Sequence, residues 1–331
     1  MKKVFVTGSE GFIGSHLVEL LVKKKFKVKA LVQYNSFNSW GWLETLEKSI
    51  LEKVEIVLGD IKDLNEMIHH TKNQDAILHL AALIGIPYSY ISPKNYIETN
   101  CVGTLNIMQA AQRNNVKKII HTSTSEVYGT AKYVPIDEKH PLNAQSPYSA
   151  SKISADHIAQ SFYNSFNLPV IILRPFNTFG PRQSLRAIIP TIFSQINNNQ
   201  KIKIGNLSPT RDFNYITDII NGFFLALNSK NKKIFGEVIN LGTGYEISIK
   251  KLIELSFDIS GKKKFVKIDP TRKRQKSSEV YRLKASNKKA KKLLNWKPKY
   301  EGINGFKKAL KMTFRWYQKN SQNFKSNIYN I

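Results

Sequence analysis

The chain has 331 residues, enough for about two domains with an ample hydrophobic core. Its single cysteine, Cys101, excludes an internal disulfide and is typical of a reducing cytoplasm, and no apolar run approaches the roughly 20 residues of a membrane span. The formal net charge of +27 is carried by scattered lysines in a chain rich in Asn and Ile. We therefore attribute the charge to overall composition and expect no specific nucleic-acid partner.

The first predicted element is an apolar strand at residues 4–6, which leads into a glycine-rich loop. Gly8, Gly11 and Gly14 precede an amphipathic helix with leucines on one side. Glycines between a strand and a helix allow a tight turn and bring the backbone close to a pyrophosphate at the helix N-terminus. The G-x-x-G-x-x-G spacing, one residue longer at its start than the common G-x-G-x-x-G, therefore predicts a dinucleotide site.

Apolar runs and helical stretches alternate along the rest of the chain. Further strands are expected at residues 28–32, 54–58, 76–80, 118–122, 170–173 and 238–241, and long helices at 96–114 and 149–166. This alternation predicts an α/β fold in which helices cover both faces of a parallel sheet. The final segment is polar and rich in Asn, so we expect a flexible tail at residues 317–331.

The end of the second strand leaves the choice of cofactor open. Dinucleotide folds often carry an acid there, about 20 residues past the glycines, that binds the adenosine ribose. This chain has Gln33, followed by the uncharged residues 34–36, so no carboxylate repels a 2′-phosphate and no arginine captures one. Gln33 can hydrogen-bond a ribose hydroxyl, which favours NAD slightly over NADP. Asp60, after the third strand, can accept from an adenine amine or simply form a turn.

Tyr148 and Lys152 are the strongest catalytic signal. Ser146 can cap a helix and Pro147 suits its first turn. On that helix Tyr148 and Lys152 share one face, where an ammonium is expected to lower the pKa of the phenol. Such a phenol can take a proton from an alcohol while a hydride leaves the same carbon. A plain surface pair would show the same spacing, and the glycine loop is what favours catalysis.

Together these motifs resemble the extended short-chain dehydrogenase/reductase superfamily, its epimerase/dehydratase branch, over residues 3–316. The resemblance implies a Rossmann domain with a doubly wound parallel sheet at 1–176 and 209–246. It implies a smaller C-terminal α/β domain for a nucleotide sugar at 177–208 and 247–316. It also implies a homodimer built on the helices at 96–114 and 148–166, and no metal. The cofactor contacts that it implies come from Gly8, Gly11, Phe12, Ile13, Gly14, Gln33, Asp60, Ile61, Leu80, Ala81, Ala82, Asn100, Tyr148 and Lys152.

The segment Thr124-Ser125-Glu126 indicates which reaction to expect. In sugar 4-epimerases of this superfamily the position of Glu126 is usually small and neutral. A carboxylate there can take the proton from carbon 5 once carbon 4 is a ketone, which is the chemistry of a 4,6-dehydratase. The dTDP-glucose dehydratases usually carry Asp where this chain has Ser125, and a serine is a poor acid. GDP-mannose 4,6-dehydratases and UDP-glucuronate decarboxylases both resemble this chain in having Thr-Ser-Glu, so the decarboxylase stays an alternative.

Segments at residues 31–42, 175–190 and 210–216 resemble the N-acetylglucosamine 4,6-dehydratases of legionaminic acid synthesis. The resemblance implies a UDP- or GDP-linked N-acetylglucosamine substrate, without identifying the base. The substrate contacts that it implies come from Asn177, Arg182, Pro190, Arg211 and Arg274. The family usually has Pro where Gln275 follows Arg274, so that assignment is the weakest. A cofactor-sensing binding protein without catalysis is the non-enzyme alternative.

Overall fold

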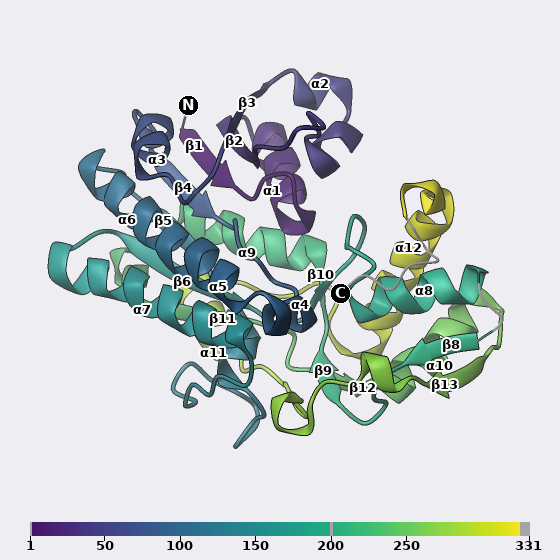
Figure 1. Cartoon of the computed structure of the whole chain (residues 1–331). Coiled ribbons are helices and arrows are strands. Elements are labelled where there is room, and N and C mark those ends of the chain that lie inside the picture. The colour runs from purple at the N-terminus through teal and green to yellow at the C-terminus, as the bar shows by residue number, and fades with distance from the viewer. Residues whose placement is uncertain (1, 199–200, 325–331) are drawn as a thin grey trace.

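The computed structural model describes residues 2–198 and 201–324 (Figure 1). Its centre is a seven-stranded parallel sheet in the order β11-β6-β5-β4-β1-β2-β3, which confirms the predicted fold class. The strands are β1 (Lys3–Thr7), β2 (Lys27–Gln33), β3 (Val54–Gly59), β4 (Ala76–His79), β5 (Ile119–Thr122), β6 (Val170–Pro175) and β11 (Val238–Leu241). The strand order reverses between β1 and β4, and ligands of such sheets bind outside the carboxyl ends of the strands at this point.

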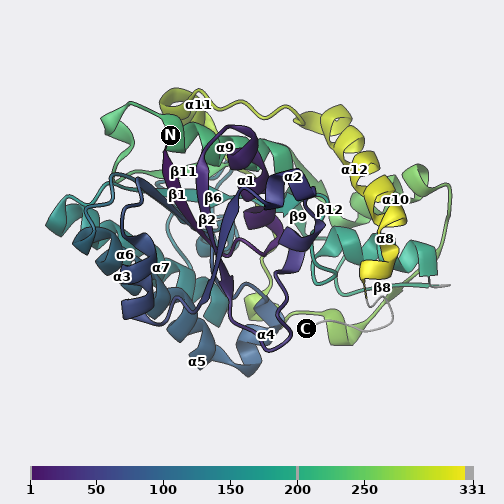
Figure 2. The same cartoon turned by 90° about the horizontal axis from the view of Figure 1, so that it is seen from above.

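Helices cover both faces of the sheet (Figure 2). One layer contains α3 (Leu64–Thr71), α6 (Gly103–Arg113) and α7 (Pro147–Phe166), and the other contains α1 (Phe12–Lys23), α9 (Ile216–Asn228) and α11 (Lys288–Leu294). The short helices α2 (Lys48–Leu51), α4 (Ile86–Ile91) and α5 (Pro93–Tyr96) lie in connections.

Two of the expected helices differ in regularity. Helix α7 begins as predicted, because the Ser146 hydroxyl accepts a hydrogen bond from the Ser149 amide and Pro147 occupies the first turn. The helix expected at 96–114 contains a π-helical segment, Ile97–Val102, before α6. Such wider turns are rare and occur often at functional sites.

The smaller part of the molecule lies beside the carboxyl ends of the central strands (Figure 1). Its helices are α8 (Ile188–Asn198), α10 (Ile249–Ser260) and α12 (Gly302–Lys319). Two-stranded sheets pair β7 (Thr178–Phe179) with β10 (Asn214–Tyr215), β8 (Lys201–Ile204) with β13 (Phe265–Ile268), and β9 (Thr210–Asp212) with β12 (Glu246–Ser248). The predicted domain boundaries stay a prediction.

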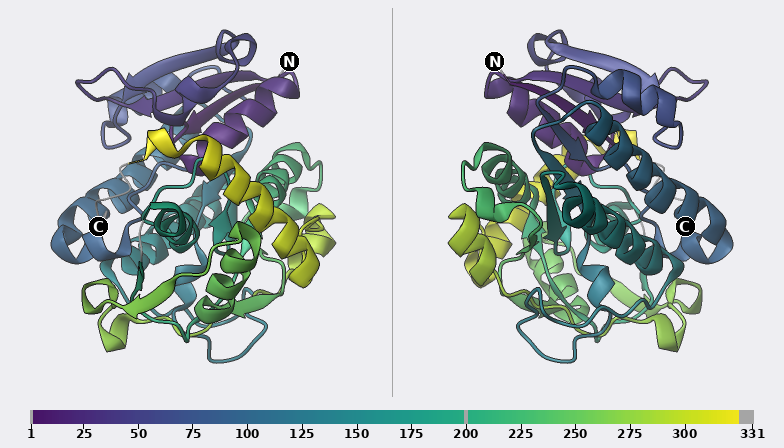
Figure 3. Two further views of the ribbon diagram at one scale, coloured as in Figure 1. Left: turned by 90° about the vertical axis from the view of Figure 1, so that its right-hand side faces the viewer. Right: turned by 90° about the vertical axis from the view of Figure 1, so that its left-hand side faces the viewer.

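Helix α12 extends across the smaller part toward the N-terminal half (Figure 3). The rings of Trp316 and Trp42 lie 5.7 Å apart, and Trp42 also contacts Phe324. The flexible tail was expected from residue 317, but α12 continues to Lys319 and Tyr317 is buried, so that expectation starts too early. The rest of that expectation, at 325–331, lies outside the described residues. Within the described part of the chain, no helix is both long and apolar enough to cross a bilayer.

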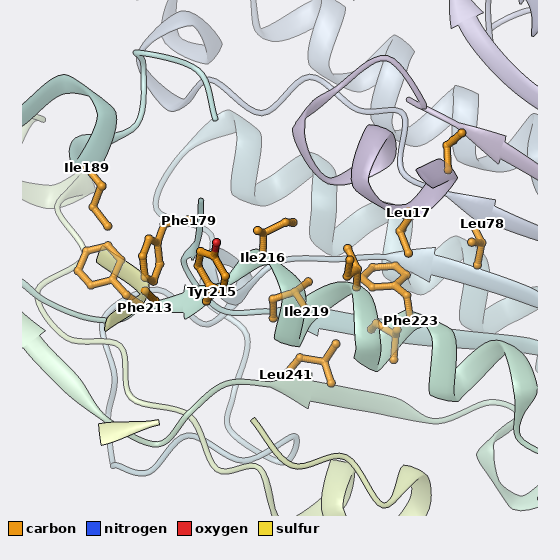
Figure 4. Packing of buried hydrophobic residues seen from close by; sticks show 14 of the residues in the cluster. Leu17, Leu78, Phe179, Ile189, Phe213, Tyr215, Ile216, Ile219, Phe223 and Leu241 are labelled. Carbon is orange, nitrogen blue, oxygen red and sulfur yellow. The ribbon is translucent and has the colours of Figure 1, made fainter. Parts of the chain in front are cut away.

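One hydrophobic cluster joins the two parts of the molecule (Figure 4). Leu17 and Leu78 lie at its Rossmann end, Tyr215 lies in the middle, and Phe213 and Ile189 lie in the smaller part. A second cluster fills the space between the sheet and the layer of α3, α6 and α7. The two parts of the molecule therefore share one continuous core.

Candidate active site

The cleft between the sheet and the smaller part is a cavity of about 1310 Å³. Ligand pockets in proteins commonly measure roughly 300–1,000 Å³, so this one has room for a dinucleotide and a second ligand. The cavity wall contains every site residue expected from the sequence except Asn100 and Pro190. The structure therefore brings the predicted cofactor, catalytic and substrate residues to one place.

The glycine loop forms one end of this cavity. Gly8 has φ +64°, and a side chain there would lie 2.7 Å from the Ala81 amide nitrogen. A side chain at Gly14 would overlap the Gly8 carbonyl oxygen. Helix α1 starts after Gly11, with no side chain capping its first amides and no acid in its first turn. Such an open helix N-terminus beside a close backbone approach fits a pyrophosphate.

The loop after β4 is held against β1 by a threonine. The Thr7 hydroxyl accepts from the amides of Leu80, at 3.2 Å, and Ala81, at 3.1 Å, and contacts His79 Nδ1 at 2.8 Å. This places the backbone of residues 80–82 opposite the glycine loop. The two loops together make a narrow slot at the switch point of the sheet.

Asn100 was expected to bind the cofactor, but it lies behind the cavity wall. Its side chain accepts from the Leu83 amide at 2.8 Å and donates to the Leu83 carbonyl and to Ser151 Oγ, both at 2.9 Å. These bonds tie the loop after β4 to α7. The amide is already fully used in this way, so Asn100 positions the wall and α7 rather than facing the cavity.

The adenosine end of the cavity includes Gln33 and Asp60. The Asp60 carboxylate accepts a hydrogen bond from the Lys62 amide at 2.9 Å and lies 3.3 Å from the Lys62 ammonium. These local contacts are typical of a turn-forming aspartate, which was one of the two interpretations of this residue. Glu10, which sequence reasoning missed, also lines this end. Its carboxylate accepts from the Gln33 amide at 3.1 Å. The sequence signal that could have identified Glu10 is its position inside the glycine motif.

Tyr148 and Lys152 project from the first turns of α7 into the cavity. Burial raises the pKa of Tyr148 above its usual range, and a hydrogen bond with the Thr124 side chain opposes this rise. Burial also lowers the pKa of Lys152 to about 8, and its ammonium donates to the Thr122 carbonyl at 2.7 Å. The expected fall of the Tyr148 pKa is therefore wrong, because desolvation of the phenol dominates.

A buried carboxylate supports the charge of Lys152. Asp156 lies four residues further along α7 and favours the ammonium form. Burial opposes its ionisation, but His121, at 3.2 Å, and Arg174, at 2.8 Å, keep the pKa of Asp156 below its usual range. The Ser123 hydroxyl also donates to it at 2.7 Å. Sequence reasoning missed Asp156, although its spacing from Lys152 was visible.

Glu126 lines the same cavity as Tyr148 and Lys152. The Thr124 hydroxyl accepts from the Glu126 amide at 3.2 Å and so fixes the start of a short 3₁₀ turn, Ser125–Tyr128. The Glu126 carboxylate lies 3.6 Å from Arg274 Nη1. Arg211 is buried nearby and lies 3.7 Å from the carboxylate of Glu279. This part of the cavity therefore contains two pairs of a carboxylate and a guanidinium group.

The remaining substrate residues behave differently from one another. Asn177 Oδ1 is buried without a hydrogen-bond partner among the described residues, and Asn177 lines the cavity. Arg182 lines it too, but its guanidinium donates to Glu19 at 2.8 Å. Pro190 is buried inside α8 and does not line the cavity, although its neighbours Ile189 and Thr191 do, so its contact with the substrate stays a prediction. Arg186 is a lining residue that sequence reasoning missed.

Sequence comparison identifies the family. The model that describes GDP-mannose 4,6 dehydratase matches residues 5–309. The chain belongs to this family. The expected membership of the NAD-dependent epimerase/dehydratase group is thereby confirmed.

Relatives of this GDP-mannose 4,6-dehydratase family member include dehydratases and epimerases. Human dTDP-D-glucose 4,6-dehydratase is 31% identical over 334 residues, covering 98% of this chain and 92% of the human protein. The dTDP-glucose 4,6-dehydratase of Bacillus anthracis, solved with NAD, superposes with a TM-score of 0.85 at 28% identity, covering 98% of this chain and 99% of its own. UDP-glucuronic acid 4-epimerase of Bacillus cereus, solved with UDP-glucuronic acid and NAD, superposes with a TM-score of 0.83 at 29% identity. The match covers 96% of this chain and 99% of the epimerase chain.

The part of the chain that the structure describes contains no cluster suited to a metal ion. Across residues 2–198 and 201–324, no group of three or more His, Cys, Asp or Glu side chains is arranged to hold a metal ion.

Proposed function

We propose that this chain is an NAD-dependent nucleotide-sugar 4,6-dehydratase that converts UDP- or GDP-linked N-acetylglucosamine to the 4-keto-6-deoxy sugar. The observation that carries the proposal is the carboxylate of Glu126 in the same cavity as Tyr148 and Lys152. A 4-epimerase needs only Tyr148 and Lys152, because it removes and returns one hydride. A second base suits a reaction that also removes the proton from carbon 5.

NAD bound along the glycine loop would accept the hydride of carbon 4 and later return it to carbon 6. Tyr148 takes the proton of the carbon 4 hydroxyl, which leaves a ketone there. For this step the phenolate must be stabilised against its burial. A hydrogen bond with the Thr124 side chain lowers the pKa of Tyr148. We assign further stabilisation of the phenolate to the ammonium of Lys152, which lies on the same helical face and which Asp156 keeps charged.

Glu126 then takes the proton of carbon 5, which the neighbouring ketone acidifies. The hydroxyl of carbon 6 leaves as water and needs a proton to do so. Ser125 is a poor acid and is buried in the wall, so it can only orient the hydroxyl. Protonated Glu126 is the acid that returns its proton to the leaving group. The sugar is left with a double bond between carbons 5 and 6, ready to receive a hydride at carbon 6 and a proton at carbon 5.

The substrate end of the cavity supports a nucleotide diphosphate. Arg211 and Arg274 present guanidinium groups that suit phosphate oxygens. Asn177 Oδ1 lacks a partner among the described residues, and as an acceptor it suits a hydroxyl or N–H group of the ligand rather than a phosphate oxygen. The similarity to N-acetylglucosamine dehydratases of legionaminic acid synthesis adds the sugar. The nucleotide base stays open between uracil and guanine.

A UDP-glucuronate decarboxylase is the second candidate, and Ser125 is the observation that favours it. A decarboxylase expels carbon dioxide from carbon 6 and has no leaving hydroxyl to protonate, so it has no need of an acid at position 125. A 4-epimerase is the third, in view of the similar Bacillus cereus enzyme. These three reactions differ in what happens at carbons 5 and 6.

Isotope labelling separates them. With substrate deuterated at carbon 4, a dehydratase yields product deuterated at carbon 6 that carries a solvent-derived proton at carbon 5, as read by mass spectrometry and NMR. Release of carbon dioxide from UDP-glucuronate, with no water loss from N-acetylglucosamine nucleotides, would assign the chain as the decarboxylase. Inversion at carbon 4 with carbon 6 unchanged would assign it as an epimerase.

A further inference from the structure

The end of β2 carries a carboxylate after all, and it comes from the glycine loop. Strand β2 ends at Gln33, where dinucleotide folds often carry the acid that binds the adenosine ribose. Glu10 Oε1 accepts a hydrogen bond from the Gln33 backbone amide at 3.1 Å. Both residues line the cavity. A carboxylate therefore stands at the expected place, although no acid occupies the expected position in the sequence.

The second oxygen of this carboxylate is unused. Glu10 Oε2 is buried and has no hydrogen-bond partner among the described residues. Burial also raises the pKa of Glu10, which shows that its surroundings do not solvate the charge. A buried acceptor without a donor costs free energy, so such an atom at a binding cavity indicates a donor supplied by a ligand.

The carboxylate is held in place by its neighbours. Glu10 lies between Gly8 and Gly11, so its backbone is fixed by the same turn that fits the pyrophosphate. Its carbonyl accepts from the Trp42 amide at 3.0 Å. Gly41 has φ +56°, and a side chain there would lie 2.9 Å from that carbonyl oxygen. The segment after β2 thus folds back onto Glu10 and leaves it little freedom to move.

The charge at this end of the cavity opposes the charge of the whole chain. The chain carries a formal net charge of +27. The charged residues that line the cavity at the glycine loop and along 31–62 are Glu10, Glu44, Asp60 and Lys62. The Lys62 ammonium is already 3.3 Å from Asp60. A phosphate on the ribose would therefore meet mostly negative charge, which repels it.

We propose that Glu10 is the residue that selects NAD over NADP: Oε2 accepts a hydrogen bond from the adenosine ribose 2′-hydroxyl, and the carboxylate repels a 2′-phosphate. The inference rests on the dinucleotide part of the proposed function and not on the reaction of the sugar. It assigns to a residue of the glycine motif a task that usually falls to the end of β2.

The test measures the dissociation constants of NAD and NADP by calorimetry on the full chain, without sugar. We expect the unaltered protein to prefer NAD. Glu10→Gln keeps an oxygen for the Gln33 amide but removes the charge and should reduce the preference about tenfold or more. Glu55→Gln removes the same charge from an exposed residue of β3 that pairs with Lys29 and does not line the cavity, so it should leave the ratio unchanged.

Three results would overturn the inference. These are equal binding of both cofactors by the unaltered protein, an unchanged ratio in Glu10→Gln, or an equal change in Glu55→Gln. Melting curves show whether each variant is folded, and Glu10→Ser, which also removes the charge, provides a second measurement with the same expected direction. Because no sugar is present, failure of the dehydratase assignment would leave the result of this experiment unaffected.

Discussion

The carboxylate of Glu126 lies 3.6 Å from the guanidinium of Arg274. The resemblance to known dehydratases assigns Arg274 to the diphosphate, whereas the structure places it beside the proposed base. Arg274 Nη1 is buried without a hydrogen-bond partner among the described residues, so this ion pair is a loose one. An arriving diphosphate would therefore compete with the Glu126 carboxylate for the Arg274 guanidinium.

Substitution of Arg274 should affect binding first. Arg274→Ala is expected to raise KM for the nucleotide sugar about 10- to 100-fold, since a hydrogen bond to a charged group contributes roughly 1.5–3 kcal/mol. Steady-state kinetics measures this. Lys273→Ala removes an equal charge from the exposed neighbour, which does not line the cavity, and should leave KM within about twofold. An equal effect of both substitutions would show that only the overall charge matters.

Tyr148→Phe should lower kcat at least about 100-fold while NAD still binds, because the ring keeps its packing and only the proton acceptor is lost. Turnover assays and cofactor calorimetry on the same sample separate the two effects. Near-normal turnover in this variant would rule out Tyr148 as the base.

The pH–rate profile should level off where Lys152 loses its proton. Burial lowers the pKa of Lys152 to about 8, so the ammonium is present below that pH and lost above it. Because the pKa of Tyr148 is raised, its phenolate still becomes more abundant above this pH, and the two changes offset each other. The value of kcat/KM, which reports the free enzyme, should therefore rise up to about pH 8 and stay level above it. Asp156→Asn removes a charge that raises the pKa of Lys152 and should move this break to lower pH.

The pH–rate profiles of folded protein, checked by circular dichroism, decide this prediction. A rate that keeps rising well above the pKa of Lys152, or a break that moves to higher pH in Asp156→Asn, would contradict it. The unaltered protein alone tests the first point, so the prediction does not depend on the stability of the variant.

Glu126→Gln should stop the reaction after the oxidation of carbon 4. Tyr148 and Lys152 remain in this variant, but the group that removes the proton of carbon 5 is gone. We expect 4-keto-6-deoxy product to fall at least about 100-fold, and exchange of the carbon 5 proton with deuterated solvent to disappear. Full exchange at carbon 5 in this variant would show that another group is the base. Glu279→Gln is the matched comparison, because Glu279 also lines the cavity.

A dimer remains a prediction, and the surface near α7 supports it. Ile91, Ile97, Val102 and Phe166 expose 66%, 45%, 42% and 54% of their surface on α4, the π-helical segment and the end of α7. Light scattering should give twice the chain mass of 37.9 kDa. Val102→Asp places a charge on this surface and should shift the measured mass toward that of the monomer. A monomeric mass for the unaltered protein would contradict the prediction.

The sequence by itself determined the sheet, most helices and the core of the catalytic set. The apolar run at 170–173 became β6 because a strand buried on both faces must be apolar throughout. Tyr148 and Lys152 came together because helical periodicity is local. Ser146 began α7 because a cap needs only its own first turn.

Only the tertiary structure decided properties that depend on distant segments. Asn100 forms hydrogen bonds with Leu83 and Ser151, because packing between segments sets the hydrogen-bond partners. The pKa of Tyr148 is raised because the same packing excludes water from the phenol. The approach of Glu10 to Gln33 follows from the fold-back of the loop after β2. Sequence periodicity describes which face of an element is buried, but not which atoms of another element it meets there.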